Sequence, residues 1–162
     1  MTNLDFLTKL RREGKLELVE VSDDICLSYS EKAENCLKSA KILLQSKLFD
    51  NSTTMSYYAM YNSLTALLFK TGIKCENHSS AILLLKFLFE NNELFKIISK
   101  AKEERIDKQY YVQSKQLAML TENSTKDLFM NAESFLINIK SIINNLTNDR
   151  IKTLRSTLLR LI

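Results

Sequence analysis

Arg105 is the residue whose place in the sequence most clearly asks for a chemical explanation. It takes the next position on an apolar stripe that recurs at helical spacing, formed by Leu94, Ile97, Ile98 and Ala101. A guanidinium keeps its charge, so facing a protein core is costly unless an acceptor, water or an anion meets it. Two explanations are open: a position at a groove rim, with nearby acids such as Glu103 and Glu104 as partners, or contact with a ligand. Spacing alone favours the first.

Asn62, the tyrosines and His78 are the other side chains that could bind a ligand. Asn62 lies on a predicted apolar stripe of its own, where a buried amide needs partners at both ends, and a structural role would supply them. Aromatic rings can stack nucleobases, but at helical spacing they more commonly serve packing. The tyrosines in question are Tyr57, Tyr58 and Tyr61, then Tyr110 and Tyr111. His78, the single histidine, stands at an expected helix start, where capping or surface exposure is its ordinary role.

Residue content excludes several kinds of site. With two glycines in the chain, no glycine-rich loop can cradle a phosphate. The three cysteines, Cys26, Cys36 and Cys75, show no CxxC spacing, and one histidine cannot complete a metal site with them. We therefore expect neither a metal nor a cofactor. The net charge of +4 permits an RNA or nucleotide partner without requiring one.

The elements that must position these residues are predicted to be helices. The chain has no proline and two glycines, so it can form few sharp turns, which favours long helices joined by short polar loops. An extended lead-in is expected around Leu16–Val21, and apolar spacing with capping residues predicts helices over residues 3–12, 22–46, 50–71, 78–90, 93–112, 124–145 and 149–162. Residues 55–69 are apolar or aromatic on nearly every side, which is typical of a helix surrounded by others.

These elements predict one domain over residues 1–162, an all-α antiparallel bundle of four to five main helices with short N- and C-terminal helices. The last helix, 149–162, is apolar on one side and basic on the other. It could pack on its own bundle, mediate dimerisation or contact a partner.

The order of several short motifs resembles the HEPN family (higher eukaryote and prokaryote nucleotide-binding domain). Residues 56–68, reading SYYAMYNSLTALL, resemble the signature of that family's second helix. A Lys70-to-Gly72 turn and a His78-Ser79 pair follow it, as in the family, and Arg105 with Tyr110-Tyr111 resembles its arginine motif. The similarity covers about residues 16–145 and implies a HEPN-like helical bundle.

The resemblance implies expectations about function that the residues partly contradict. Many members of the family are implied to be homodimeric RNA-cleaving toxins, in which an arginine is followed after four to six residues by a histidine, and many are paired with a neutralising nucleotidyltransferase. Here Tyr110 and Tyr111 occupy the histidine window, and Ile106 stands where a polar residue is usual. A phenol with an ordinary pKa of about 10 is a poor general base near neutrality. Efficient cleavage is therefore not expected, and the resemblance is closer to the arginine–tyrosine branch.

Three functions are consistent with these features. The first is a homodimeric module that binds RNA, a nucleotide or a nucleotidyltransferase partner through a cleft centred on Arg105. The residues expected to contact the ligand there are Arg105, Asp107, Gln109, Tyr110, Tyr111, Asn62, Tyr58 and His78. The second is an RNase toxin of a toxin–antitoxin pair, with Arg105 and Tyr110 as catalytic residues. The third is a purely structural interaction protein. We expect a cytoplasmic protein, because residues 1–10 do not resemble a signal peptide and no apolar stretch is long enough to span a membrane.

Overall fold

The structure is a computed structural model that describes the backbone of residues 2–110 and 122–162, and the side chains of 2–106 and 122–162. Its elements follow in the order α1 (Asn3–Arg12), β1 (Leu16–Leu18), α2 (Asp23–Gln45), α3 (Phe49–Lys70), β2 (Ile73–Cys75), α4 (His78–Phe87), α5 (Asn92–Tyr110), α6 (Glu122–Asn144) and α7 (Asn148–Leu161). The all-α class predicted from the sequence is confirmed. None of the described helices is long and apolar enough to cross a membrane.

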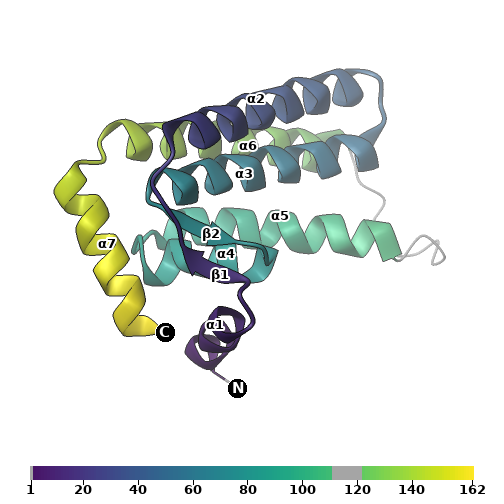
Figure 1. Cartoon of the computed structure of the whole chain (residues 1–162). Helices are drawn as coiled ribbons and strands as arrows, with labels where there is room; N and C mark the ends of the chain where they lie inside the picture. The colour runs from purple at the N-terminus through teal and green to yellow at the C-terminus, as the bar shows by residue number, and fades with distance from the viewer. Residues whose placement is uncertain (1, 111–121) are drawn as a thin grey trace.

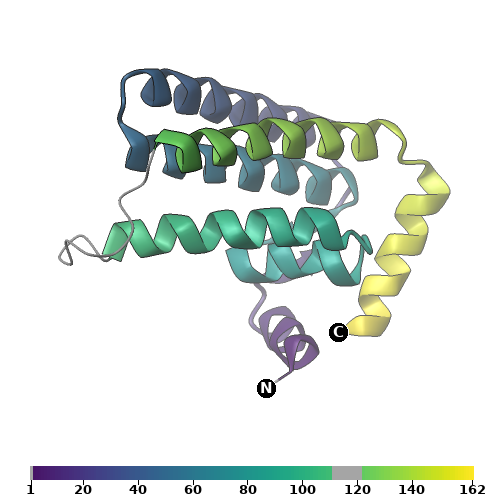
Figure 2. The ribbon, with the colours of Figure 1, turned by 180° about the vertical axis from the view of Figure 1, so that it is seen from behind.

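Helix α3 lies at the centre of the bundle. It contacts α2, α5 and α6, and the four helices lie side by side in Figure 1 and in the opposite view of Figure 2. The chain reverses direction between α2 and α3, and α5 and α6 also run in opposite directions (Figures 1 and 2). Side chains on nearly every side of α3 are buried, among them Tyr57, Met60 and Leu64, each at 0% exposure. The prediction that residues 55–69 are surrounded by other helices is therefore confirmed.

Local capping chemistry explains where the helices around the centre begin and end. The Ser22 hydroxyl accepts a hydrogen bond from the Ile25 amide at 3.2 Å and so caps the start of α2. Helix α3 ends just before Gly72, whose φ of +69° is a left-handed conformation that glycine adopts without strain. Helix α4 was predicted to reach Glu90 but ends at Phe87. This prediction was wrong because the Asn91 amide donates back to the Leu85 carbonyl at 2.7 Å, which turns the chain toward α5.

The structure contains a small antiparallel sheet. The sequence predicted only an extended segment at Leu16–Val21, without a partner strand. Strand β1 pairs with β2 in the register Leu16↔Cys75 and Leu18↔Ile73. Leu16 and Ile73 are buried at 1% and 0% exposure. The sheet thereby joins the segment before α2 to the segment after α3, and it leads directly into His78 at the start of α4.

Helix α7 packs against its own chain. Ile151, Leu154 and Leu158 are buried on its apolar side. On its basic side, Arg155 Nη1 donates to the carbonyls of Val19 at 2.7 Å and Gly72 at 2.8 Å. Of the three placements left open for residues 149–162, the structure has the intramolecular one. A role of the same helix in assembly stays a prediction, as does the assignment of residues 1–162 to one domain.

Candidate functional site

The site begins with three tyrosines on α3, at positions 57, 58 and 61. Tyr57 is fully buried, and its hydroxyl lies 2.6 Å from Nδ1 of His78. Tyr61 stacks on the His78 ring with centroids 3.6 Å apart and planes 15° from parallel. His78 is the first residue of α4 because Asn77 caps that helix through its own side chain. His78 is therefore half-buried against α3. The capping role that its position suggested is performed by Asn77 instead.

Arg105 of α5 contacts the same tyrosines from the other side. Its Nη2 donates to the Tyr58 hydroxyl at 3.2 Å, and its guanidinium carbon lies 5.4 Å and 5.1 Å from the ring centroids of Tyr57 and Tyr58. A guanidinium over aromatic faces gains cation–π attraction while it remains partly accessible. Two turns earlier on this face Ile98 is fully buried, so packing of the stripe brings Arg105 to α3. The charge is held at the edge of the core, half-buried.

Lys102 adds a second basic group beside Arg105 and His78. Its Nζ donates to the hydroxyl of Ser79, the second residue of α4. Burial lowers the pKa of Lys102, and the nearby charge of Arg105 lowers it further. Burial likewise lowers the pKa of His78 below its ordinary value, with Arg105 and Lys102 acting in the same direction. We call Arg105, Lys102 and His78 the cationic cluster.

The phenols of Tyr57 and Tyr61 are protonated at physiological pH. Burial raises the pKa of Tyr57 strongly and that of Tyr61 to about 12. Neither hydroxyl can act as a base near neutrality, since proton abstraction requires a group whose pKa lies near the working pH. The arrangement is suited instead to holding an anion: a guanidinium fork, an ammonium and an imidazole are hydrogen-bond donors whose mutual repulsion an anionic group would relieve.

The comparison with protein families agrees with this architecture. A family model for the HEPN domain matches residues 28–153. The chain belongs to the HEPN family. The match includes all of α3, α4 and α5, which carry the cationic cluster, and the resemblance drawn from the sequence motifs is thereby confirmed.

Relatives of this HEPN protein occur in bacteria and archaea. It is 28% identical over 123 residues to a "UPF0332 protein" of Thermotoga maritima, covering 73% of this chain and 90% of that protein. It is also 28% identical over 121 residues to "Putative toxin MJ0605" of Methanocaldococcus jannaschii, covering 72% of this chain and 87% of that protein. A "UPF0332 protein glr0978" of Gloeobacter violaceus is 39% identical over 54 residues, which is 33% of this chain and 43% of that protein.

Within the HEPN domain, the predicted ligand residues take different places. Tyr58 contacts Arg105 through its hydroxyl, and His78 packs against Tyr58. Asn62 is 5% exposed, and its amide donates to Cys36 Sγ of α2 at 3.5 Å, a contact between helices rather than one with Arg105. The remaining predicted residues are Asp107, Gln109 and Tyr110, whose backbone lies in α5 but whose side chains lie outside those described, and Tyr111, which lies outside the described residues.

Sequence reasoning missed Tyr57, Tyr61, Lys102 and Ser79 as parts of the site. The two tyrosines were noted but interpreted as packing, and nothing in the local spacing marks Lys102 or Ser79. The signal that could have identified them was the His78-Ser79 pair of the family resemblance. It places a polar group at the start of α4, next to the tyrosine-rich face of the preceding helix.

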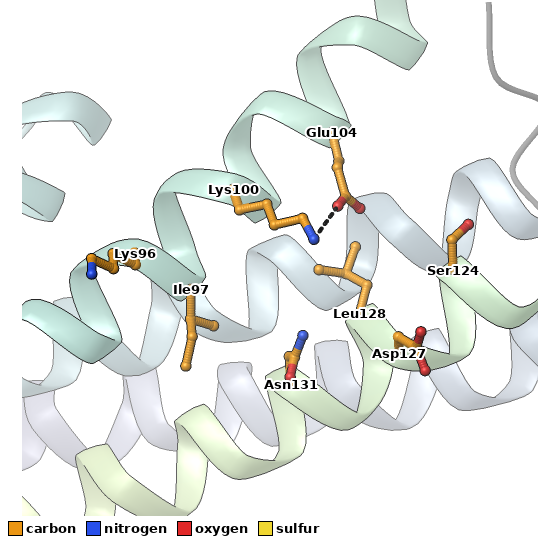
Figure 3. Close-up of a pocket in the computed structure, with 8 residues that line it drawn as sticks. All are labelled: Lys96, Ile97, Lys100, Glu104, Ser124, Asp127, Leu128 and Asn131. Carbon is orange, nitrogen blue, oxygen red and sulfur yellow. Dashed lines mark ion pairs between the residues drawn. The ribbon is translucent and has the colours of Figure 1, made fainter.

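The HEPN domain also has a pocket on another face of α5, between that helix and α6 (Figure 3). Its volume is about 250 Å³, and Arg105 does not line it. Lys100 and Glu104 face each other across 3.8 Å at one wall. Glu104 Oε2 is buried and has no hydrogen-bond partner among the residues that the structure describes. Among the residues that the structure describes, no group of three or more histidines, cysteines, aspartates or glutamates is arranged to hold a metal ion.

Proposed function

We propose that this HEPN domain binds the phosphate of RNA or of a nucleotide at the cationic cluster, as a homodimer and without efficient cleavage. The observation that carries the proposal is the position of Arg105. Its guanidinium is held by the Tyr58 hydroxyl and lies over two aromatic rings, beside two further nitrogen donors on α4 and α5. This is a preorganised donor set, and guanidinium with phosphate forms strong, charge-assisted hydrogen bonds.

The directions of the pKa shifts support an anion as the ligand. Lys102 and His78 both have lowered pKa values, in part because they repel Arg105. A phosphate bound among them would reverse that repulsion and favour the charged form of each. A neutral or cationic ligand would leave the repulsion in place. The tyrosine rings at positions 57, 58 and 61 are largely occupied by contacts with one another and with His78, so we assign the ligand's recognition to its phosphate rather than to stacking of its base.

The test is binding of a fluorescein-labelled 12-nucleotide single-stranded RNA, with ATP and AMP as competitors. We expect Arg105→Ala to weaken binding by about 1.5–3 kcal/mol, or roughly 10- to 150-fold, because a charged hydrogen bond is lost. Arg105→Lys should recover only part of that loss, since the planar fork is absent. For RNA, the dependence of log Kd on log salt should also decrease by about 0.7 in slope, the contribution of one phosphate contact on a single strand.

The matched control is Lys100→Ala. It removes one positive charge from the same helix, at a side chain that is 75% exposed and faces the pocket with Glu104. It should leave the affinity nearly unchanged. If Arg105→Ala is well folded by circular dichroism and binds all three probes as the unmodified protein does, the phosphate assignment is refuted. Competition by ATP but not by AMP would assign the site to polyphosphates, and competition by neither would assign it to RNA.

A toxin that cleaves RNA is the second candidate, because one relative carries the name "Putative toxin MJ0605". Arg105 and Tyr110 would be its catalytic residues, and a nucleotidyltransferase would be its neutralising partner. Induced expression should then arrest growth, and purified protein should cut RNA with loss of activity in Arg105→Ala. Intact RNA after prolonged incubation at high protein concentration would leave the binding function standing and exclude this one.

The homodimer is tested by sedimentation of the full chain and of a chain truncated after Asn148. Helix α7 buries its apolar side within its own chain, so we expect assembly to survive the truncation and stability to decrease. A monomer in both forms would remove the dimer from the proposal. A dimer only in the full chain would assign assembly to α7.

A further inference from the structure

We propose that His78 is a direct ligand of the bound phosphate, donating a hydrogen bond from Nε2, while Tyr57 acts as the positioning residue that keeps the proton on that nitrogen. This inference rests on the proposed function. It adds His78, on α4, to Arg105 as a second ligand of the phosphate. The arginine–histidine motif of the family would instead place its histidine shortly after Arg105 in the sequence.

The hydrogen bond between Tyr57 and His78 has a defined direction. The two atoms, the Tyr57 hydroxyl and Nδ1, are 2.6 Å apart. Tyr57 is fully buried, and burial raises the pKa of its phenol, so the hydroxyl keeps its proton. Among the described residues, His78 Nδ1 is the hydrogen-bond partner of this hydroxyl. The phenol therefore donates to Nδ1, and a neutral imidazole that accepts at Nδ1 carries its own hydrogen at Nε2.

The imidazole is held in a fixed orientation. Tyr61 stacks on one face of the ring with centroids 3.6 Å apart, and Tyr58 meets it nearly edge-on, with centroids 6.5 Å apart and planes at 84°. With Nδ1 also tied to Tyr57, rotation of the ring would break three contacts. Nε2 lies on the opposite side of the ring from the tied nitrogen. A donor that is already oriented loses little entropy when it binds a ligand.

Aromatic and basic side chains surround the imidazole ring. Among the side chains that the structure describes, the titratable and charged groups facing His78 are the three phenols of α3, at Tyr57, Tyr58 and Tyr61, and the two cations of α5, at Lys102 and Arg105. Burial, and then the two cations, lower the pKa of the imidazole, whereas burial raises the pKa of the Tyr57 and Tyr61 phenols. An N–H donor beside two cations attracts an anion without adding a third positive charge to the free protein.

This arrangement separates binding from cleavage. General-base catalysis requires an unprotonated nitrogen facing the substrate, and here the unprotonated nitrogen is occupied by Tyr57. His78 can donate to a phosphate oxygen but cannot take a proton from a ribose hydroxyl through Nε2. The same geometry thus explains why a HEPN domain with Arg105 and a nearby histidine would hold RNA or a nucleotide without cutting it.

The direct test is nitrogen-15 NMR of the imidazole, which is unambiguous because the chain contains one histidine. We expect the Nε2–H tautomer at neutral pH, and its Nε2 signal should shift on addition of AMP or the RNA probe. Phosphate binding should also raise the apparent pKa of His78. Tyr57→Phe should produce a mixture of tautomers, a result that a purely structural hydroxyl would not give. A dominant Nδ1–H form in the unmodified protein, or no response to saturating ligand, would overturn the assignment.

The second test compares substitutions at position 78. His78→Ala should weaken RNA binding by roughly 2- to 12-fold, as expected for one neutral hydrogen bond, whereas His78→Gln, which keeps an N–H donor near the Nε2 position, should retain most of the affinity. If His78→Ala binds normally while Arg105→Ala does not, the role of His78 is refuted and the phosphate site survives. If neither substitution alters binding, the proposed function fails as well. The NMR measurement decides the matter on the unmodified protein should His78→Ala be unfolded.

Discussion

Gly72 lies at the corner between α3 and β2, and replacing it with alanine should lower the stability of the fold. Its φ is +69°, and a Cβ added there would lie 1.9 Å from Arg155 Nη1 and 2.7 Å from the Val19 carbonyl oxygen. Arg155 is the side chain by which α7 binds this corner, donating to the carbonyls of Val19 and Gly72. Gly72→Ala therefore strains the backbone and also displaces the guanidinium from its acceptors.

The magnitude follows from these two effects. A left-handed conformation costs an alanine about 1–2 kcal/mol. Displacing a charged donor from its carbonyl acceptors adds about 1.5–3 kcal/mol. Gly14 is the matched control, since its φ is +67° and the nearest atom to an added Cβ is a Glu17 side-chain oxygen at 3.5 Å. Gly14→Ala should therefore show only the backbone effect, and Gly72→Ala should destabilise the protein by about 2 kcal/mol more.

The assay is urea unfolding followed by circular dichroism, with Gly14→Ala, Gly72→Ala, Arg155→Ala and the Gly72→Ala/Arg155→Ala pair. Because Gly72 and Arg155 act through the same contacts, their effects should be less than additive, whereas Gly14 and Arg155 should be additive. Equal destabilisation by the two glycine substitutions would refute the reasoning. So would full additivity of Gly72→Ala with Arg155→Ala, since the clash would then not involve the guanidinium.

Three further predictions concern the core, the pH dependence of stability and the support of Arg105. Phe135→Ala, at a fully buried ring, should cost about 3–5 kcal/mol of unfolding free energy, whereas Ile137→Ala, at a side chain that is 69% exposed, should cost little; similar values for the two would contradict the packing. The pKa of His78 is lowered from 6.5 in the folded protein, so the unfolded chain binds the proton first; stability should fall as pH drops through and below 6.5, and His78→Gln should lack that decrease in pH-dependent denaturation. Tyr58→Phe keeps the ring under Arg105 but removes its hydrogen bond, so RNA affinity should decrease roughly 2- to 12-fold without a change in fold; a loss as large as that of Arg105→Ala would mean that the hydroxyl contacts the ligand itself.

The helices could be predicted from the sequence because their signals are local. A capping serine at position 22 and a glycine at position 72 delimit two of the longest helices, and apolar spacing specifies which face of each is buried. The end of α4 could not be predicted, because Glu90 adopts a left-handed φ of 54° that its residue type does not favour. The tertiary position of the chain decides that conformation.

The small sheet illustrates the same limit. Its two strands are short, lie on either side of two long helices in the sequence, and pair Leu16 with Cys75. Pairing between such distant segments depends on the packing of the helices between them, and three-residue strands carry too little alternation to be recognised. The sequence predicted an extended segment at this place and could not name its partner.

By itself, the sequence determined that this protein is a bundle of long helices of the HEPN family and that Arg105 stands on a stripe where a charge needs a partner. It could not determine the partner, because the rings of Tyr57 and Tyr58 and the imidazole of His78 come from other helices. Periodicity reports which side of one helix is buried, and it carries no information about which side chains of another helix will face it. That choice is made by the packing of α3, α4 and α5, which brings three nitrogen groups to the tyrosines of α3 and so assembles a cluster that no single segment contains.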